Sequence, residues 1–233
     1  DIRWYGILIG VAFLLAIYIS YLRAPKFGIV QDDILDLTIF LIPCSIIGAR
    51  AYYVIFSYDN YRGNFIQMLN LRAGGLAIHG GIIAGVIVSY IVAKRKKIKF
   101  SNLADLIMPQ VALAQAIGRW GNFFNSEAHG GPTNLPWAIT VYGEKVHPTF
   151  LYESIWCFFI FILLIFLSNK IKFNGQIALL YAMLYSFERF WVEGLRTDSL
   201  MIGKFRQAQV LSLVVFILAL SAYIYQVRKY KKK

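Results

Sequence analysis

Residues 148–167 read Pro-Thr-Phe-Leu-Tyr-Glu-Ser-Ile-Trp-Cys-Phe-Phe-Ile-Phe-Ile-Leu-Leu-Ile-Phe-Leu, and this stretch decides the class of fold. Glu153 is its one charged residue, and bulky aliphatic or aromatic side chains fill most other positions. About 20 predominantly apolar residues are enough for a helix to cross the ~30 Å hydrocarbon core of a bilayer. We therefore predict a transmembrane helix here.

The composition of the whole chain agrees with a membrane protein. Of 233 residues, 58% are hydrophobic and 15% are charged, and the mean hydropathy is +0.58. A soluble domain carries roughly 25% charged residues. We predict an all-α polytopic membrane protein that forms one domain over residues 1–233, with no internal repeat and no soluble second domain.

The net charge of +12 suggests nucleic-acid binding at first sight. The lysines and arginines, however, lie in short clusters between apolar runs. Cytoplasmic loops of membrane proteins show this distribution. The charge pattern therefore argues against a nucleic-acid partner.

Apolar runs of membrane-spanning length recur along the chain and predict seven transmembrane helices. The predicted spans cover approximately residues 4–21, 32–56, 76–93, 101–124, 148–167, 175–193 and 207–225. The first span leads into the turn at 21–25, not a small-residue cleavage site, so no cleavable signal peptide is expected. Ser101 to Asp105 has the composition of a helix start and is expected to cap the fourth span.

Basic residues predict the orientation of the spans. They cluster at Arg23 and Lys26, at 94–99, at 170–172 and at 228–233. The positive-inside rule places these ends in the cytoplasm, so the N-terminus is predicted outside and the C-terminus inside. A polar segment at 125–147 then lies on the outer face as an arm, in which 137–142 could form a short strand or lie in the membrane interface.

The first candidate site is the stretch 118–131, Gly-Arg-Trp-Gly-Asn-Phe-Phe-Asn-Ser-Glu-Ala-His-Gly-Gly. Arg119, Asn122 and Asn125 follow the i, i+3, i+6 spacing of one helical face. A guanidinium flanked by amide donors suits a phosphate ester, which accepts charge-assisted hydrogen bonds. The same groups could line the path of a transported anion, or Arg119 could simply extend to the interface.

The second candidate site lies at the end of the sixth span. Tyr185, Arg189, Glu193 and Arg196 follow helical spacing and share one face, so we expect Glu193 to pair with both arginines. A structural ladder of ion pairs is the alternative. Two arginines on a face that would meet Arg119 favour a site for an anionic lipid headgroup.

Other polar residues are less decisive. His79 stands among glycines at 74–81, which leave room for a ligand, although a hydrogen bond to a neighbouring helix is the alternative. Glu153 is a carboxylate inside an apolar span and needs a partner. His129 and His147 are expected to structure the outer arm. Asp32, Asp33 and Asp36 are expected to be solvated helix caps.

No zinc, nucleophile-elbow or phosphate-loop motif is present, so no metal and no cofactor are expected. Cys44 and Cys157 lie in apolar runs and are expected to be packing residues. The residues alone leave two classes open, a lipid-modifying enzyme and a lipid transporter. His79 could act as a general base in the first.

Five motifs in order also resemble the prolipoprotein diacylglyceryl transferase family of bacteria. The resemblance covers nearly the whole chain and is carried by Ile2-Arg-Trp-Tyr-Gly6, Ile78-His-Gly-Gly81, Gly118 to Gly130, His147-Pro-Thr-Phe-Leu-Tyr-Glu153, and Arg189 to Arg196 with the Thr-Asp-Ser-Leu that follows. One departure is visible, because Phe150 stands where the family usually has glutamine. If that glutamine positions lipid or helix, its contact is missing here or supplied elsewhere.

The resemblance implies an activity at the outer face of the bacterial cytoplasmic membrane. The diacylglyceryl group of phosphatidylglycerol would pass to the lipobox cysteine of a preprolipoprotein, forming a thioether and releasing glycerol 1-phosphate. The nucleophile would thus belong to the substrate, in keeping with the absence of a candidate catalytic cysteine. An anionic-lipid transporter or scramblase with the same cavity remains the alternative.

The resemblance also implies roles for individual residues. Arg119 and Arg189 would bind the phosphate and stabilise it as it leaves, and His79 would take the thiol proton or orient the headgroup. Further positions are expected to bind substrate: Tyr5, Asn122, Asn125, Glu127, Gly130, Tyr185, Glu193 and Arg196. Asn125 is included because of its spacing from Arg119, and the others because they match the family's motifs.

Overall fold

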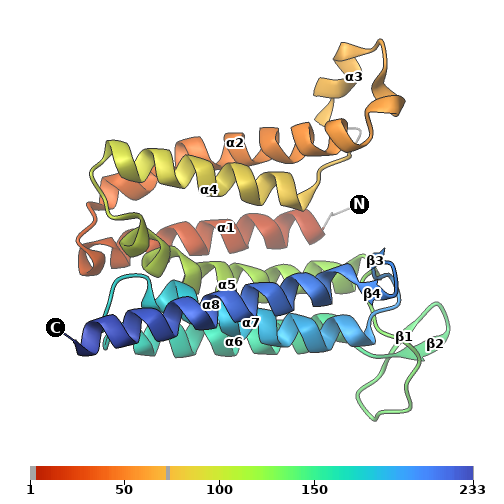
Figure 1. Cartoon of the computed structure of the whole chain (residues 1–233). Helices are drawn as coiled ribbons and strands as arrows, with labels where there is room; N and C mark the ends of the chain where they lie inside the picture. The colour runs from red at the N-terminus through yellow and green to blue at the C-terminus, as the bar shows by residue number, and fades with distance from the viewer. Residues whose placement is uncertain (1–3, 72–73, 233) are drawn as a thin grey trace. The chain divides into compact units, whose positions relative to one another are not determined.

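A computed structural model describes residues 4–71 and 74–232 of the chain, and most of them are helical (Figure 1). Ile2 and Arg3 of the N-terminal motif and Lys233 of the basic tail lie outside the described residues. The long helices are α1 (Trp4–Arg23), α2 (Gln31–Phe56), α4 (Ile78–Arg95), α5 (Phe100–Phe124), α6 (Thr149–Leu167), α7 (Gln176–Leu195) and α8 (Gln207–Lys231).

Each predicted span coincides with one of these long helices. By length and composition, the segments Trp4–Phe27, Gln31–Phe56, Ile78–Arg95, Thr149–Leu167 and Gln207–Lys231 are candidate membrane spans. The chain is therefore a mostly helical, multi-pass membrane protein. The other two long helices, α5 and α7, carry most of the ionisable residues of the candidate site, so a count of seven crossings stays a prediction.

The chain divides into two compact units, residues 21–103 and residues 1–20 with 104–233. In the 21–103 unit, α2 and α4 lie side by side (Figure 1) and meet at two glycines. A Cβ on Gly48 would come within 2.7 Å of the Gly80 carbonyl oxygen, and a Cβ on Gly80 would come closer still to the Gly48 oxygen. Lys96, just after the end of α4, forms ion pairs with Asp33 at 2.9 Å and Asp36 at 2.5 Å near the start of α2. These two aspartates are therefore ion-paired and are not merely solvated caps.

Arg50 on α2 organises the connection from α2 to α4, a role that the sequence did not suggest. Only 5% of Arg50 is exposed, and its guanidinium donates to the carbonyl oxygens of Gln67 at 2.7 Å, Met68 at 2.8 Å, Gly74 at 2.6 Å and Gly75 at 3.0 Å. The connection contains η2 (Tyr58–Tyr61) and α3 (Phe65–Leu69). Arg50 therefore fixes the chain just before the α4 residue His79.

The second unit places α5, α6 and α7 around a core of apolar side chains. Ala112, Ile160, Leu164 and Ile177 are fully buried there. Asp105 does not cap its own helix as expected, because α5 already begins at Phe100. Its carboxylate instead accepts backbone N–H groups of Gly175 at 2.6 Å and Ala178 at 2.9 Å, and so caps α7.

Two short hairpins extend this unit at the end where α5 and α7 finish (Figure 1). In the first hairpin β1 (Ile139–Val141) pairs antiparallel with β2 (Glu144–Val146), and in the second β3 (Met201–Ile202) pairs with β4 (Phe205–Arg206). The expected strand within 137–142 is thereby confirmed. The remaining short element, η1 (Ala24–Phe27), follows α1.

Candidate functional site

Three helices meet at one carboxylate near the end of the α5–α6–α7 bundle where α5 and α7 finish. Glu153 on α6 is 1% exposed, and its Oε1 lies 3.0 Å from Arg119 Nη2 on α5 and 2.7 Å from Arg189 Nη1 on α7. The structure thus brings together the two arginines that the sequence had singled out separately. It also shows the partner that Glu153 needed, which makes Glu153 a member of the site.

Arg189 has a second carboxylate partner on its own helix. Its Nη2 lies 2.6 Å from Glu193 Oε2, as the i, i+4 spacing predicted. Glu193 and Arg196 form no direct ion pair among the described residues, although they lie within electrostatic range of each other. Because α7 ends at Leu195 and Arg196 has extended backbone angles, its guanidinium leaves the helical face.

Arg196 instead holds Asp198 in a two-pronged ion pair. Its Nε donates to Asp198 Oδ1 at 2.9 Å and its Nη2 to Oδ2 at 2.7 Å. The Arg196 guanidinium lowers the pKa of the Asp198 carboxyl below its usual range. This pair stiffens the loop between α7 and the second hairpin.

Two tyrosines from the predicted set flank the cations. Tyr185 lies on α7 within electrostatic range of Arg119 and Arg189, and its ring stacks on Tyr181 at 5.7 Å. The ring of Tyr5 on α1 packs against α5 at Gly121, where an added Cβ would collide with it. Glycine at 121 therefore makes the room that brings Tyr5 to this end of α5.

The amides that follow Arg119 organise a carboxylate in the outer arm. Asn122 Nδ2 and Asn125 Nδ2 both donate to Glu127 Oε1, at 3.0 Å and 3.3 Å. α5 ends at Phe124, so Asn125 lies just beyond the helical face on which it was placed. Ser126 and Ala128, on either side of Glu127, have the positive φ angles of 52° and 57° that non-glycine residues seldom adopt.

Gly130 joins the outer arm to the end of α7. Its N–H donates to His147 O at 2.9 Å, and the next residue, Gly131, donates to Leu195 O at 2.9 Å. A Cβ on Gly130 would lie 2.6 Å from His147 Cβ and 3.1 Å from Leu195 O, so this junction accepts only glycine without rearrangement. The prediction that His129 and His147 structure the arm agrees with the contacts of their Nδ1 atoms, to Gly130 O and to Tyr152 Oη respectively.

His79 lies in the other unit, at the second position of α4. Its ring faces that of Tyr52 on α2 at 6.1 Å and is otherwise largely exposed. The grouping of His79 with the two arginines therefore stays a prediction. In the described ranges, no three His, Cys, Asp or Glu residues are grouped so that they could hold a metal ion.

A buried carboxylate on α7 was missed by the sequence reasoning. Glu188 is 6% exposed, and within the described part of the chain neither of its oxygens has a hydrogen-bond partner. It lies within electrostatic range of Glu153, Arg119 and Arg189. The sequence spacing could have indicated this residue, because Glu188 follows Tyr185 by three positions and therefore shares its helical face.

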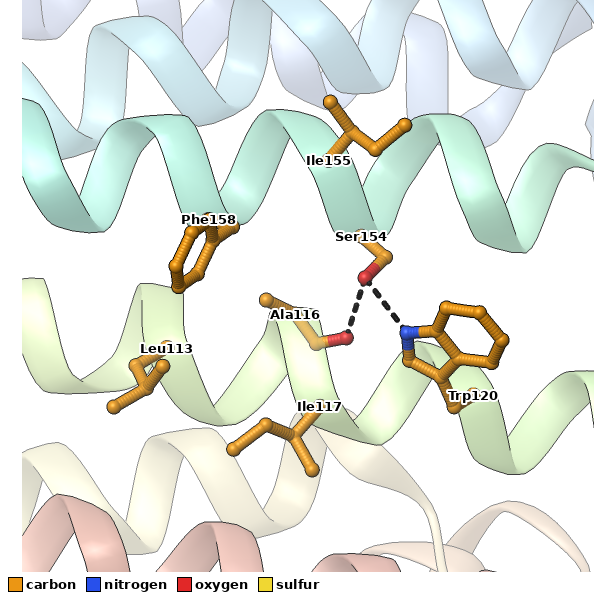
Figure 2. Close-up of a pocket in the computed structure, with 7 residues that line it drawn as sticks. All are labelled: Leu113, Ala116, Ile117, Trp120, Ser154, Ile155 and Phe158. Carbon is orange, nitrogen blue, oxygen red and sulfur yellow. Dashed lines mark hydrogen bonds between the residues drawn. The ribbon is translucent and has the colours of Figure 1, made fainter.

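An apolar groove runs between α5 and α6 (Figure 2). Its volume is about 480 Å³ and its walls include Leu113, Ile117 and Phe158. Figure 2 shows how the few polar groups are satisfied: Trp120 Nε1 donates to Ser154 Oγ at 3.1 Å, and Ser154 Oγ donates to Ala116 O at 2.8 Å. The groove thus offers a hydrocarbon surface formed in part by Trp120 and Ser154, the sequence neighbours of Arg119 and Glu153.

Phe150, which replaces the glutamine usual in the resembled family, is buried in an aromatic cluster. Its ring lies 5.4 Å from that of Trp120 and 5.0 Å from that of Phe123. Aromatic packing therefore supplies the contact between α6 and α5 at this position.

Comparison with known proteins identifies the family of the chain. Residues 1–225 match the model of the family described as prolipoprotein diacylglyceryl transferase. The chain belongs to this family. It is accordingly a transferase.

Several bacterial relatives are similar over more than nine-tenths of their length. A protein of Clostridioides difficile is 52% identical over 231 residues, which covers 99% of this chain and 93% of the relative. A protein of Finegoldia magna is 52% identical over 234 residues, covering 100% and 93%. One of Clostridium kluyveri is 44% identical over 235 residues, covering 97% and 92%. All three are named phosphatidylglycerol–prolipoprotein diacylglyceryl transferase.

Proposed function

We propose that this transferase moves the diacylglyceryl group of phosphatidylglycerol to the lipobox cysteine of a preprolipoprotein. The relatives carry both substrates in their name. The observation that carries the proposal is the convergence of Arg119 and Arg189 on a single oxygen of Glu153. Two guanidinium groups held this close form a preorganised site for a phosphodiester.

The reaction is a substitution at a glycerol carbon. The substrate thiol loses its proton, its sulfur forms a bond to that carbon, and the bond from the same carbon to the phosphate oxygen breaks. The bonding electrons leave with glycerol 1-phosphate, whose new negative charge falls on the oxygens beside Arg119 and Arg189. Stabilising this charge in a site of low dielectric is the main task of the protein.

Glu153 has a distinct part in this scheme. Before lipid binds, its carboxylate balances the two arginines, which would otherwise repel each other in a buried site. The phosphate oxygens then take over these contacts. His79 remains the candidate that accepts the thiol proton or orients the headgroup.

The remaining substrate-binding assignments rest on position in the site. Tyr185 flanks the cations, Glu193 holds Arg189, and Tyr5 packs at the end of α5. Asn122, Asn125 and Glu127 form a hydrogen-bonded group one turn further out. Gly130 and Arg196 lie at the junction between the arm and the end of α7, where they pair as an isolated bridge.

For the topology, we propose seven crossings of the bacterial cytoplasmic membrane and a site that opens to the outer face. The basic residues Lys170, Lys172 and Arg228 to Lys232 lie at the helix ends away from the arginine cluster, as the positive-inside rule requires. The arm 125–147 would then cover the site from outside, within one transferase domain of residues 1–233. The groove between α5 and α6 would take an acyl chain of the lipid.

The function is tested with purified protein, phosphatidylglycerol vesicles and a lipobox peptide. We expect release of glycerol 1-phosphate and formation of a diacylglyceryl peptide, both of which disappear when the peptide cysteine is replaced by serine. Movement of lipid between the leaflets of the vesicles, with no modified peptide, would instead support the transporter or scramblase alternative.

A further inference from the structure

Glu188 on α7 is a buried carboxylate to which the scheme above gives no task. It is 6% exposed, and within residues 4–71 and 74–232 neither of its oxygens has a hydrogen-bond partner. A polar group that is buried without a partner costs stability, so its presence calls for an explanation other than stability.

The burial pattern of α7 directs this carboxylate into the helix bundle. Phe187 and Trp191 are 47% and 63% exposed, whereas Glu188 and Val192 are buried. Each of these pairs follows i, i+4 spacing and so occupies one face of the helix. Glu188 therefore points away from the exposed face and towards the interior.

The neighbours of Glu188 place it beside the arginine pair. Glu188 is within electrostatic range of Arg119, Arg189 and Glu153. It is also within electrostatic range of Cys157, which follows Glu153 by four residues and so lies about one turn further from the hairpins along α6. The carboxylate thus faces the part of the bundle just beyond the arginines, on the side away from the outer arm.

The proposed reaction needs a proton acceptor on this side. With the phosphate of the lipid at the arginines, the reacting glycerol carbon lies on the membrane side of the phosphate, because the acyl chains run from the glycerol into the bilayer. Substitution at a saturated carbon requires the sulfur to approach opposite the bond that breaks. The thiol therefore loses its proton on the membrane side of the phosphate, which is the side that Glu188 faces.

The other two carboxylates near the arginines have a different task. Glu153 Oε1 is held by both arginines, and Glu193 is paired with Arg189. A proton on either of them would remove a counter-charge from the phosphate site. Glu188 can accept a proton while all of these ion pairs stay intact.

We propose that Glu188 accepts the proton of the substrate thiol, an inference that rests on the proposed function. The proton moves from sulfur to a Glu188 oxygen, the sulfur bonds to the glycerol carbon, and the bond from that carbon to the phosphate oxygen breaks with its electrons on the oxygen. The proton then passes from Glu188 to a phosphate oxygen of the departing glycerol 1-phosphate, which leaves Glu188 ionised for the next turnover. His79 is left with the second of its two roles, orientation of the headgroup.

The test uses two lipobox peptides that differ only in the nucleophile, cysteine or selenocysteine. A selenol is far more acidic than a thiol and is ionised at neutral pH without a base. The thioether or selenoether product is measured by mass spectrometry under reducing conditions. A general base typically contributes about 10²- to 10⁴-fold, so we expect Glu188→Gln to lower kcat/KM for the cysteine peptide by about 10²-fold or more and for the selenocysteine peptide by less than about 10-fold.

Three controls separate proton transfer from other effects. Arg119→Ala should lose activity equally with both peptides, because the phosphate must be stabilised whichever nucleophile attacks. Glu144→Gln, at an exposed position of the outer arm, should behave like wild type with both. Glu188→Asp keeps a carboxylate and should retain more activity with the cysteine peptide than Glu188→Gln does.

A binding measurement shows that the variant is folded. Glycerol 1-phosphate is expected to stabilise wild type and Glu188→Gln equally against thermal unfolding, because its binding needs the arginines and no proton transfer. Weaker stabilisation of Glu188→Gln would show that Glu188 shapes the phosphate site, and would overturn its assignment as the proton acceptor.

The outcomes distinguish this inference from the proposed function. Wild-type rates in Glu188→Gln, or equal losses with both peptides, would overturn the inference and leave the transferase function standing. Rescue of His79→Asn by selenocysteine, without rescue of Glu188→Gln, would assign the proton to His79 instead. Absence of modified peptide from the wild type with either nucleophile would refute the proposed function, and the inference with it.

Discussion

Arg119 and Arg189 bind the same oxygen atom, Glu153 Oε1, from two different helices. Like charges this close are stable only with a counter-charge, and Glu153 is nearly inaccessible to solvent. The arrangement fixes the two guanidinium groups in the geometry that a phosphodiester would bridge. It ties α5, α6 and α7 together at the depth where the chemistry is proposed.

Loss of either arginine should stop turnover without unfolding the protein. We expect Arg119→Ala and Arg189→Ala each to lower the rate of transfer by ~10²-fold or more, since each removes a donor to the developing phosphate charge. Arg62→Ala is the control, because Arg62 is exposed and its guanidinium contacts the exposed residues Asp59 and Tyr58. Activity of either site variant close to that of wild type would contradict the placement of the phosphate.

Removal of the shared counter-charge should cost stability. Glu153→Gln leaves two partly buried cations, of which Arg189 keeps Glu193 as a partner, and the cost is therefore below the roughly 3–5 kcal/mol typical of breaking a fully buried ion pair from one side. We expect a lower Tm in detergent, partly restored by glycerol 1-phosphate, which supplies the missing negative charge. Glu144→Gln, at an exposed position, should change neither quantity. An unchanged Tm in Glu153→Gln would show that Glu153 does not hold the arginines.

Replacement of Glu188 and of Glu193 by glutamine should change the Tm in different directions. A buried carboxylate without a hydrogen-bond partner destabilises the folded state, so Glu188→Gln is expected to keep or raise the Tm. Glu193→Gln removes the ion pair with Arg189 and is expected to lower it. Thermal unfolding of the two variants measures both changes in Tm. A marked loss of stability in Glu188→Gln would show that Glu188 does not destabilise the folded state.

The close contact between Tyr5 and Gly121 can be tested with a single methyl group. Gly121→Ala places a Cβ within 2.4 Å of the Tyr5 ring, and overpacking of this kind costs about 1–3 kcal/mol. We expect a lower Tm and a loss of activity as Tyr5 is displaced. Gly118→Ala on the same helix would meet only the end of the Ile9 side chain at 3.4 Å and should be tolerated.

The Arg196–Asp198 pair predicts a dependence of stability on pH. Because the pKa of Asp198 is lowered in the folded state, its contribution is present above the ordinary aspartate pKa of about 3.9 and is lost as the pH falls through the folded value. We expect wild type to have a higher Tm than Asp198→Asn at pH 7, and this difference to shrink below about pH 4. A difference that is constant from pH 7 to pH 3 would show that Asp198 stabilises the loop by other means.

Much of the site was predictable because its components follow local rules. The i, i+4 spacing placed Arg189 beside Glu193, and the length of the apolar runs predicted the helices. The same reasoning failed where a helix ended, since Arg196 and Asn125 lie past the last turns of α7 and α5. Helix ends depend on the tertiary contacts of the following residues, here the backbone bonds that Gly130 and Gly131 make.

The sequence by itself determined a multi-pass helical membrane protein and its family, and it singled out Arg119 and Arg189 as candidate site residues. These follow from composition, periodicity and motifs, which are properties of neighbouring residues. Only the tertiary structure decided that Glu153 is their common partner, that Asp105 caps α7, and that Phe150 packs among aromatic rings. Each of these joins residues far apart in the chain, and such a pairing depends on how the helices pack, which no local pattern specifies.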